Sequence, residues 1–184
     1  MLYRNARASD LEPIIALHVA EQWRAYAHIL PAGYLREEMP AQKRALWSAR
    51  LAPGVDRERL SILVAESAAR QVVGFICFVF ESSDTWGSYL HNLYVASSHQ
   101  RQGIARRLLV EGISGLGSDM RAAPVHLLVY RANEPARALY ERLGGSVVEQ
   151  FTRGDPPVEL FRYQWASADV LRQRAGGGLS PPPP

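Results

Sequence analysis

The sequence predicts a single α/β domain, built on a mixed β-sheet of six or seven strands with helices on both faces. Its 184 residues suit one domain. Hydrophobic residues make up 47% of the chain and charged residues 21%, which is typical of a folded globular protein and not of a disordered one. Short β-rich stretches alternate with longer stretches of helical spacing, and this alternation predicts the α/β class.

The predicted strands are short and rich in apolar and β-branched residues. They cover residues 2–6, 61–66, 72–81, 88–95, 124–130, 147–152 and 158–165. A short polar turn separates 61–66 from 72–81, so these two strands are expected to form a hairpin. The longest apolar run, 72–80, suits a buried strand and is far too short to span a membrane.

The predicted helices begin and end at recognisable residues. The first helix starts near Leu11, after the possible caps Ser9 and Asp10. The other predicted helices cover residues 34–51, 104–116 and 134–143. Asn133 caps the last of these, and a glycine pair ends it. The helix at 104–116 joins the strands 88–95 and 124–130, and such a crossover makes those two strands parallel.

The folded domain is expected to span residues 1–166 and to be followed by a flexible tail at 167–184. The tail finishes in RAGGGLSPPPP. Three glycines followed by four prolines cannot pack a core, which predicts a flexible segment with a short polyproline II end.

Composition excludes several classes of protein. The net charge is +3, from twenty arginines and Lys43 against 18 acidic residues, but no basic run or nucleic-acid motif appears, so no nucleic-acid partner is expected. Cys77 is the only cysteine, which excludes an intrachain disulfide and a cysteine-based zinc cluster, and no metal is expected. The N-terminus lacks the apolar core of a signal peptide, so we expect a cytoplasmic protein without a membrane partner.

A tight polar turn follows the strand 88–95, and the next helix is expected to open near Arg101 with Gly103 in its first turn. Unpaired backbone N–H groups at a helix N-terminus bind anions, and the groups of residues 101–105 suit a pyrophosphate. Gly103 and Ala105 are small enough to let an anion approach the backbone. The spacing alone fits equally well a helix start that binds nothing. It matches neither a Walker loop nor a Rossmann fingerprint.

The segment 100–105, QRQGIA, resembles the first motif of the GNAT superfamily of acyl-CoA-dependent N-acetyltransferases. The second family motif is a strand followed by Asn, then Tyr seven residues later, then Gly, which Asn133, Tyr140 and Gly144 match. The resemblance covers roughly residues 1–166. It departs from the family at Gly145, where an aromatic residue usually stands.

The resemblance implies an acetyl-CoA co-substrate held where the strands 88–95 and 124–130 splay apart. The implied cofactor-binding residues are Leu93, Tyr94, Val95, Arg101, Gln102, Gly103, Ile104, Ala105, Arg106 and Asn133. The backbone of 93–95 would pair with pantetheine, and the Val95 N–H would donate to the thioester oxygen. Tyr140 is implied as the catalytic acid that protonates the departing thiolate, and the aromatic segment 23–34 as a wall of the acceptor site.

The general base stays open. Relatives carry Glu at the positions of Tyr89 or Leu128, and both positions lack a carboxylate here. His91 is the catalytic candidate, since it lies two residues after Tyr89 on the same strand face and a histidine titrates near neutral pH. Glu81 and Asp84, acting through water, are the rivals.

The expected function is acetyl transfer from acetyl-CoA to a primary amine by direct attack in a ternary complex. The amine belongs to a small molecule or to a protein, and the enzyme is a monomer or a homodimer. The alternative is a non-catalytic acyl-CoA-binding or regulatory protein on the same fold. No hydrolase or metalloprotease motif is present.

Overall fold

The computed structural model describes residues 1–80 and 85–177. Its seven strands form one sheet in the order β1-β2-β3-β4-β5-β7-β6. The strands are β1 Leu2–Asn5, β2 Leu60–Glu66, β3 Val72–Val79, β4 Ser88–Val95, β5 Val125–Tyr130, β6 Ser146–Arg153 and β7 Val158–Trp165. Neighbouring strands are antiparallel except β4 and β5, which are parallel. The predicted mixed sheet, the hairpin and the parallel pair are confirmed.

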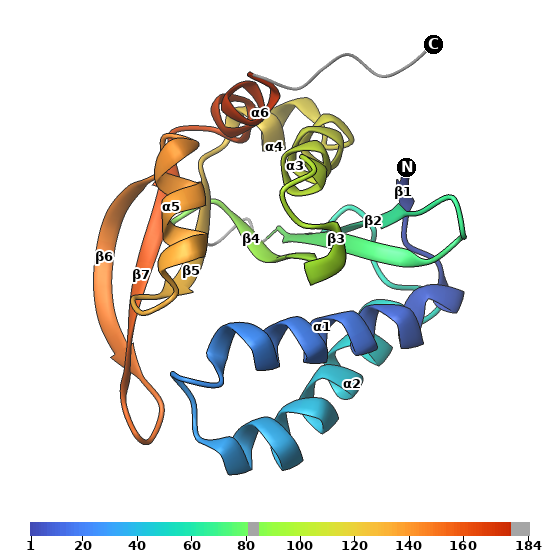
Figure 1. Cartoon of the computed structure of the whole chain (residues 1–184). Helices are drawn as coiled ribbons and strands as arrows, with labels where there is room; N and C mark the ends of the chain where they lie inside the picture. The colour runs from blue at the N-terminus through green and yellow to red at the C-terminus, as the bar shows by residue number, and fades with distance from the viewer. Residues whose placement is uncertain (81–84, 178–184) are drawn as a thin grey trace.

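Helices cover both faces of the sheet (Figure 1). They are α1 Leu11–Tyr26, a π-helical turn Tyr34–Glu38, α2 Met39–Arg50, α3 Ile104–Ser114, α4 Ser118–Ala122, α5 Glu134–Arg142 and α6 Ala168–Gly176. Helices α1 and α2 lie on one face, and α3, α4 and α6 on the other. Two separate apolar cores follow from this layering: Trp47 and Phe75 belong to the α1–α2 core, and Leu108, Leu127 and Trp165 to the other.

The expectation of a flexible tail from residue 167 is wrong for its first part. Helix α6 begins after Ser167, whose hydroxyl accepts a hydrogen bond from the Val170 N–H at 3.1 Å. Ala168, Leu171 and Ala175 are fully buried in the α3 core, so the folded unit extends beyond 166. Their three-residue and four-residue spacing is a helical signal that the Gly/Pro-rich end obscured. The prolines that end the chain lie outside the described residues.

The family departure at Gly145 has a packing reason. A Cβ built on Gly145 would lie 2.5 Å from the Trp165 indole, so no side chain fits there. Trp165 itself is 2% exposed and donates a hydrogen bond from Nε1 to the Leu143 carbonyl at 2.8 Å. The indole of β7 therefore fills the space next to the end of α5.

Candidate functional site

Strands β4 and β5 share only two paired positions, Ser88 with Val125 and Tyr89 with His126. Beyond them the β4 edge has no paired neighbour, and Figure 1 shows the sheet divided here into a β1–β4 part and a β5–β7 part. The absence of a partner strand leaves main-chain donors and acceptors on β4 for an extended ligand.

The β3–β4 register decides which main-chain groups face this gap. The Ala96 N–H donates to the Val73 carbonyl at 2.8 Å, and Val95 stands opposite Gly74. Because N–H groups alternate in direction along a strand, those of Leu93 and Val95 point away from β3 and into the gap. Tyr94 differs from the expectation: the same alternation turns its main chain toward β3, and its ring packs in the α1–α2 core.

The turn after β4 ends in two residues with left-handed backbone. Arg101 has φ +62° and Gly103 φ +79°, and Gly103 is the N-cap of α3 and not part of its first turn as predicted. The first bond of the helix runs from the Arg107 N–H to the Gly103 carbonyl at 3.0 Å. The N–H groups before Arg107 in the first turn of α3, including those of Ile104 and Ala105, have no helical partner and are available to an anion.

Two of the side chains in the predicted pyrophosphate-binding turn, the cradle at 101–106, make other contacts. The Arg106 guanidinium donates to the main-chain carbonyls of Arg174, Ala175 and Gly177 at 3.1 Å or less, so it ties α3 to the end of α6. Only the Arg106 main chain remains for an anion, which corrects the expectation for its side chain. The Ile104 side chain is buried in the core. Arg101 and Gln102 are exposed beside the helix start, as a cradle requires.

Glu21 of α1 holds this turn in place, and no sequence motif predicted this role. Its carboxylate is 7% exposed and accepts from the Ser97 N–H at 2.9 Å and from Gln100 Nε2 at 3.3 Å. Gln100 Nε2 also donates to the Val95 carbonyl at 2.9 Å. The first residue of the motif therefore fixes the loop to β4 and α1.

Tyr140 lies among other tyrosines near the gap. Tyr140 of α5 packs its ring 6.0 Å from Tyr163, and burial raises its pKa, with smaller contributions from Tyr26 and Tyr89. The hydroxyls of Tyr26 and Tyr94 lie 3.4 Å apart. Because its pKa is raised, Tyr140 is protonated at neutral pH and retains a proton to donate.

Asn133 begins α5 at the same gap. Its Oδ1 accepts from the Ala136 N–H at 3.4 Å, which confirms the predicted cap. A hydrogen bond between the side chains of Asn133 and Tyr26 also lowers the Tyr26 pKa, against a larger rise from burial. The end of α1 and the start of α5 are thus linked across the gap.

His91 lies in a β-bulge. Cys77 of β3 pairs with Asn92 and Phe78 with Leu90, so His91 is the extra residue. The His91 ring contacts Tyr89 at 5.0 Å, consistent with the predicted shared face, and the bulge brings Asn92 to the same side. Its Nδ1 lies 2.7 Å from Asn92 Oδ1. Burial, with the Arg50 guanidinium beside it, lowers the pKa of His91 to about 4.

Arg50, the last residue of α2, completes this corner. Its Nη1 lies 3.2 Å from His91 Nδ1 and donates to Asn92 Oδ1 at 3.1 Å. Sequence reasoning missed it because the bulge, which the pattern of β4 does not reveal, sets the contact. The rival bases Glu81 and Asp84 lie outside the described residues.

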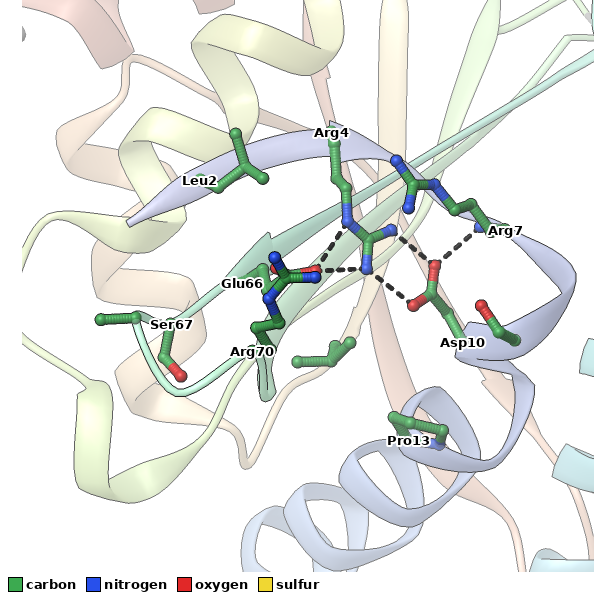
Figure 2. A pocket seen from close by; sticks show the side chains of 11 residues that line it. Leu2, Arg4, Arg7, Asp10, Pro13, Glu66, Ser67 and Arg70 are labelled. Carbon is green, nitrogen blue, oxygen red and sulfur yellow. Dashed lines mark hydrogen bonds and ion pairs between the residues drawn. The ribbon is translucent and has the colours of Figure 1, made fainter.

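A separate hollow of about 580 Å³ lies by β1 and the β2–β3 hairpin (Figure 2). Arg4 fills its wall and bonds to both Asp10, at 2.7 Å, and Glu66, at 2.6 Å. The Asp10 carboxylate also accepts from the Arg7 N–H at 2.7 Å. These carboxylates join β1, β2 and the start of α1 through Arg4, so the network is structural.

Two searches of the described residues were negative. Across 1–80 and 85–177, no cluster of three or more His, Cys, Asp or Glu side chains is placed to hold a metal ion. No helix in that part of the chain combines the length and the apolar character needed to cross a membrane.

Known proteins resemble this arrangement. The uncharacterized N-acetyltransferase YuaI of Bacillus subtilis is 30% identical over 112 residues, which are 59% of this chain and 60% of the relative's own length. The PaiA N-acetyltransferase of Thermoplasma acidophilum, solved with coenzyme A, has a TM-score of 0.72 at 18% identity, over 89% of this chain and 98% of that one.

A putative acetyltransferase of Salmonella typhimurium, YncA, solved with acetyl-CoA, has a TM-score of 0.62 at 20% identity, over 92% and 94% of the two chains. At these identities the two structures establish a shared fold. The model of the acetyltransferase (GNAT) family matches residues 19–145, which include the β4 edge, the α3 start and Tyr140. This match covers more than half of the chain, so the chain, with its splayed strands and the turn before α3, belongs to the acetyltransferase (GNAT) family.

Proposed function

We propose that the protein transfers an acetyl group from acetyl-CoA to a primary amine by direct attack in a ternary complex. The observation that carries the proposal is the unpaired β4 edge beside the free N–H groups of the α3 start. An extended pantetheine fits the first and a pyrophosphate the second. Acetyl-CoA supplies the activated acyl group, and the chain supplies position and proton transfer.

Leu93 and Val95 would bind the pantetheine arm, and the N–H groups from Arg101 to Arg106 the pyrophosphate. Asn133 would contact the same ligand from the start of α5. The Val95 N–H is the proposed donor to the thioester oxygen, where negative charge develops as the amine attacks. A donor on an ordered strand edge requires no rearrangement at that moment.

Proton movement completes the proposed reaction. The amine loses a proton, the new C–N bond forms, and the C–S bond breaks with its electron pair on sulfur. Tyr140 would donate its proton to that sulfur, and its hydroxyl has no hydrogen-bond partner in the described part of the chain that would compete. The Tyr140 oxygen then regains a proton from solvent.

His91 is the proposed acceptor of the amine proton, directly or through water. Its pKa of about 4 means that the ring is unprotonated at neutral pH and ready to accept. The same low pKa makes it a weak base, so an intervening water that passes the proton on to solvent suits it. Glu81 and Asp84 remain rivals in this role.

The test is release of free CoA from acetyl-CoA with a panel of amines, comparing the natural chain with Tyr140→Phe. We expect kcat to fall at least tenfold, since a positioned acid contributes on the order of 10²–10⁴ in rate. CoA affinity should change less than threefold. Tyr3→Phe, which alters a half-buried tyrosine on β1, is the matched control and should keep full activity.

Two results would contradict the proposal. CoA binding without turnover of any amine would favour the alternative, a non-catalytic acyl-CoA-binding protein. Full kcat in Tyr140→Phe would show that solvent, and not this hydroxyl, protonates the thiolate.

A further inference from the structure

Several cations act on the β4 residues Tyr89 and His91. Burial raises the pKa of the Tyr89 hydroxyl, while the guanidinium groups of Arg153, Arg162 and Arg50 each lower it. These groups come from β6, β7 and the end of α2, and Arg162 is also paired with Glu149. Lys43 adds a fourth positive charge near His91 and lowers its pKa.

Arg50 differs in its partners from the half-buried arginines that pair with carboxylates, and also from Arg106, which has no carboxylate but donates to three main-chain carbonyls. Arg4 bonds to two carboxylates, and Arg162 donates to Glu149 at 2.8 Å. Arg50 donates to Asn92 and to the Cys77 sulfur at 3.4 Å, and contacts His91, all through Nη1. Among residues 1–80 and 85–177, no carboxylate lies within ion-pair distance of it.

A half-buried guanidinium without an anion is an unusual state. Withdrawing a charge from water costs free energy unless an opposite charge or a full set of hydrogen bonds replaces the water. Three neutral groups lie within hydrogen-bond distance of Arg50 Nη1, and the guanidinium lies 5.4 Å from the centre of the Trp47 ring, while Nε and Nη2 have no hydrogen-bond partner among the described residues. A guanidinium edge of this kind matches the two oxygens of a carboxylate.

The position of Arg50 brings the free edge of its guanidinium close to the expected place of the reacting amine. It contacts His91, the proposed proton acceptor, at the bulge two residues before Leu93. An anion on Arg50 therefore lies beside the place where the amine loses its proton. The aromatic rings of Tyr26 and Tyr130, 4.9 Å apart, offer an apolar wall near the same side of the gap.

We propose that the acceptor is an amine that also carries a carboxylate, and that Arg50 binds this carboxylate. The inference rests on the proposed acetyl transfer and names its substrate class. A polyamine would bring further positive charge to a site where Arg50 and Lys43 already act on His91, and is disfavoured for that reason.

Matched acceptors test the carboxylate separately from the amine. We would measure CoA release with L-phenylalanine and L-phenylalaninamide, with glycine and glycinamide, and with spermidine. We expect each acid to exceed its amide at least tenfold in kcat/KM, mainly through KM, and spermidine to be the poorest acceptor. The amide amine is the less basic of each pair, so unassisted chemistry favours the amide and cannot imitate this result.

Arg50→Gln should abolish the preference, bringing each acid within threefold of its amide. Any effect of this variant through His91 alters both members of a pair equally and cancels in their ratio. Arg44→Gln is the control: it removes the same charge from an exposed position on α2, where the partner is Glu12, and should keep the preference.

The outcomes separate this inference from the proposed function. Equal use of acid and amide, efficient use of spermidine, or an acid preference that survives in Arg50→Gln would overturn the carboxylate site and leave acetyl transfer intact. Absence of CoA release with every amine would overturn acetyl transfer. Calorimetry with N-acetyl-L-phenylalanine and CoA then decides the site alone: Arg50-dependent binding supports it, and absence of binding overturns it.

Discussion

Lowering the pH from 7 to 5 should destabilise this protein through two uncharged histidines, the buried His18 and the half-buried His91. His18 is fully buried among the rings of Trp47, Phe75 and Tyr94. Burial, with the nearby cations of the α2 helix, lowers its pKa to about 2, and the pKa of His91 is about 4. His18 Nδ1 accepts from Trp47 Nε1 at 2.8 Å, so the neutral ring carries its proton on Nε2, which is buried without a partner, and a second proton on Nδ1 would break the bond to Trp47.

The sign and size follow from proton linkage. The unfolded chain binds protons at an ordinary histidine pKa of about 6.5 and the folded chain does not, so stability is lost as pH falls below that value. At pH 5 the protonated unfolded form is favoured about thirtyfold per histidine, which is about 2 kcal/mol each. Because both folded pKa values lie below 5, the result depends little on their exact size. Together the two remove about 4 kcal/mol of a total that is commonly 5–15 kcal/mol.

Urea unfolding at the two pH values, at constant ionic strength, measures this loss. His18→Gln keeps an oxygen that can accept from Trp47 but cannot titrate, so its pH-dependent loss should be about half that of the natural chain. The comparison is between pH values within each variant, so a lower stability of His18→Gln at pH 7 does not matter. A natural chain that loses less than about 1 kcal/mol, or a variant that retains the whole loss, would refute the reasoning.

Three further predictions address the cradle, the base and the C-terminal helix. Gly103→Glu should weaken CoA binding at least tenfold by calorimetry, whereas Gly54→Glu, which bears the same left-handed strain in an open loop, should bind CoA normally; equal affinities would remove the cradle. Between pH 5.5 and 8, kcat should show no inflection from His91, and His91→Ala should lower kcat at least tenfold across this range. Near-normal rates in His91→Ala would favour Glu81 or Asp84 as the general base. Leu171→Ala should cost about 2–5 kcal/mol in urea unfolding, while an unchanged midpoint would mean that α6 contributes nothing to the core.

The sheet was predictable because its strands have simple signals. Val72–Val79 is almost wholly apolar, and the helix after β4 forces a parallel neighbour, so the parallel pair followed from chain order, whereas the gap between its strands was expected from the family resemblance. Asn133 and Tyr140 were found because they belong to a recognisable spacing. The strands depend on local sequence, which periodicity captures, and the motif residues on the resemblance to the family.

The rest depends on contacts between distant segments. The bulge at His91 exists only in the register of β3 against β4, and it brings Asn92 to the side where Arg50 lies. Glu21 binds a loop 76 residues away. Helix α6 is stabilised by burial against α3 and not by strong local propensity. None of these pairings leaves a periodic trace in one sequence.

The contact between Trp165 and Gly145 carries a consequence for related sequences. Both positions contribute to one volume, and only one of them can hold a ring. Relatives with an aromatic residue directly after the motif glycine are therefore expected to have a small residue at the position of Trp165, so that the two sites covary. A ring supplied from β7 attaches the end of α5 to the strand, whereas a ring supplied from position 145 would place that anchor on the turn. The same volume can thus be filled from β7 or from the turn at position 145. The segment that supplies the ring is expected to tolerate mutation less than the other.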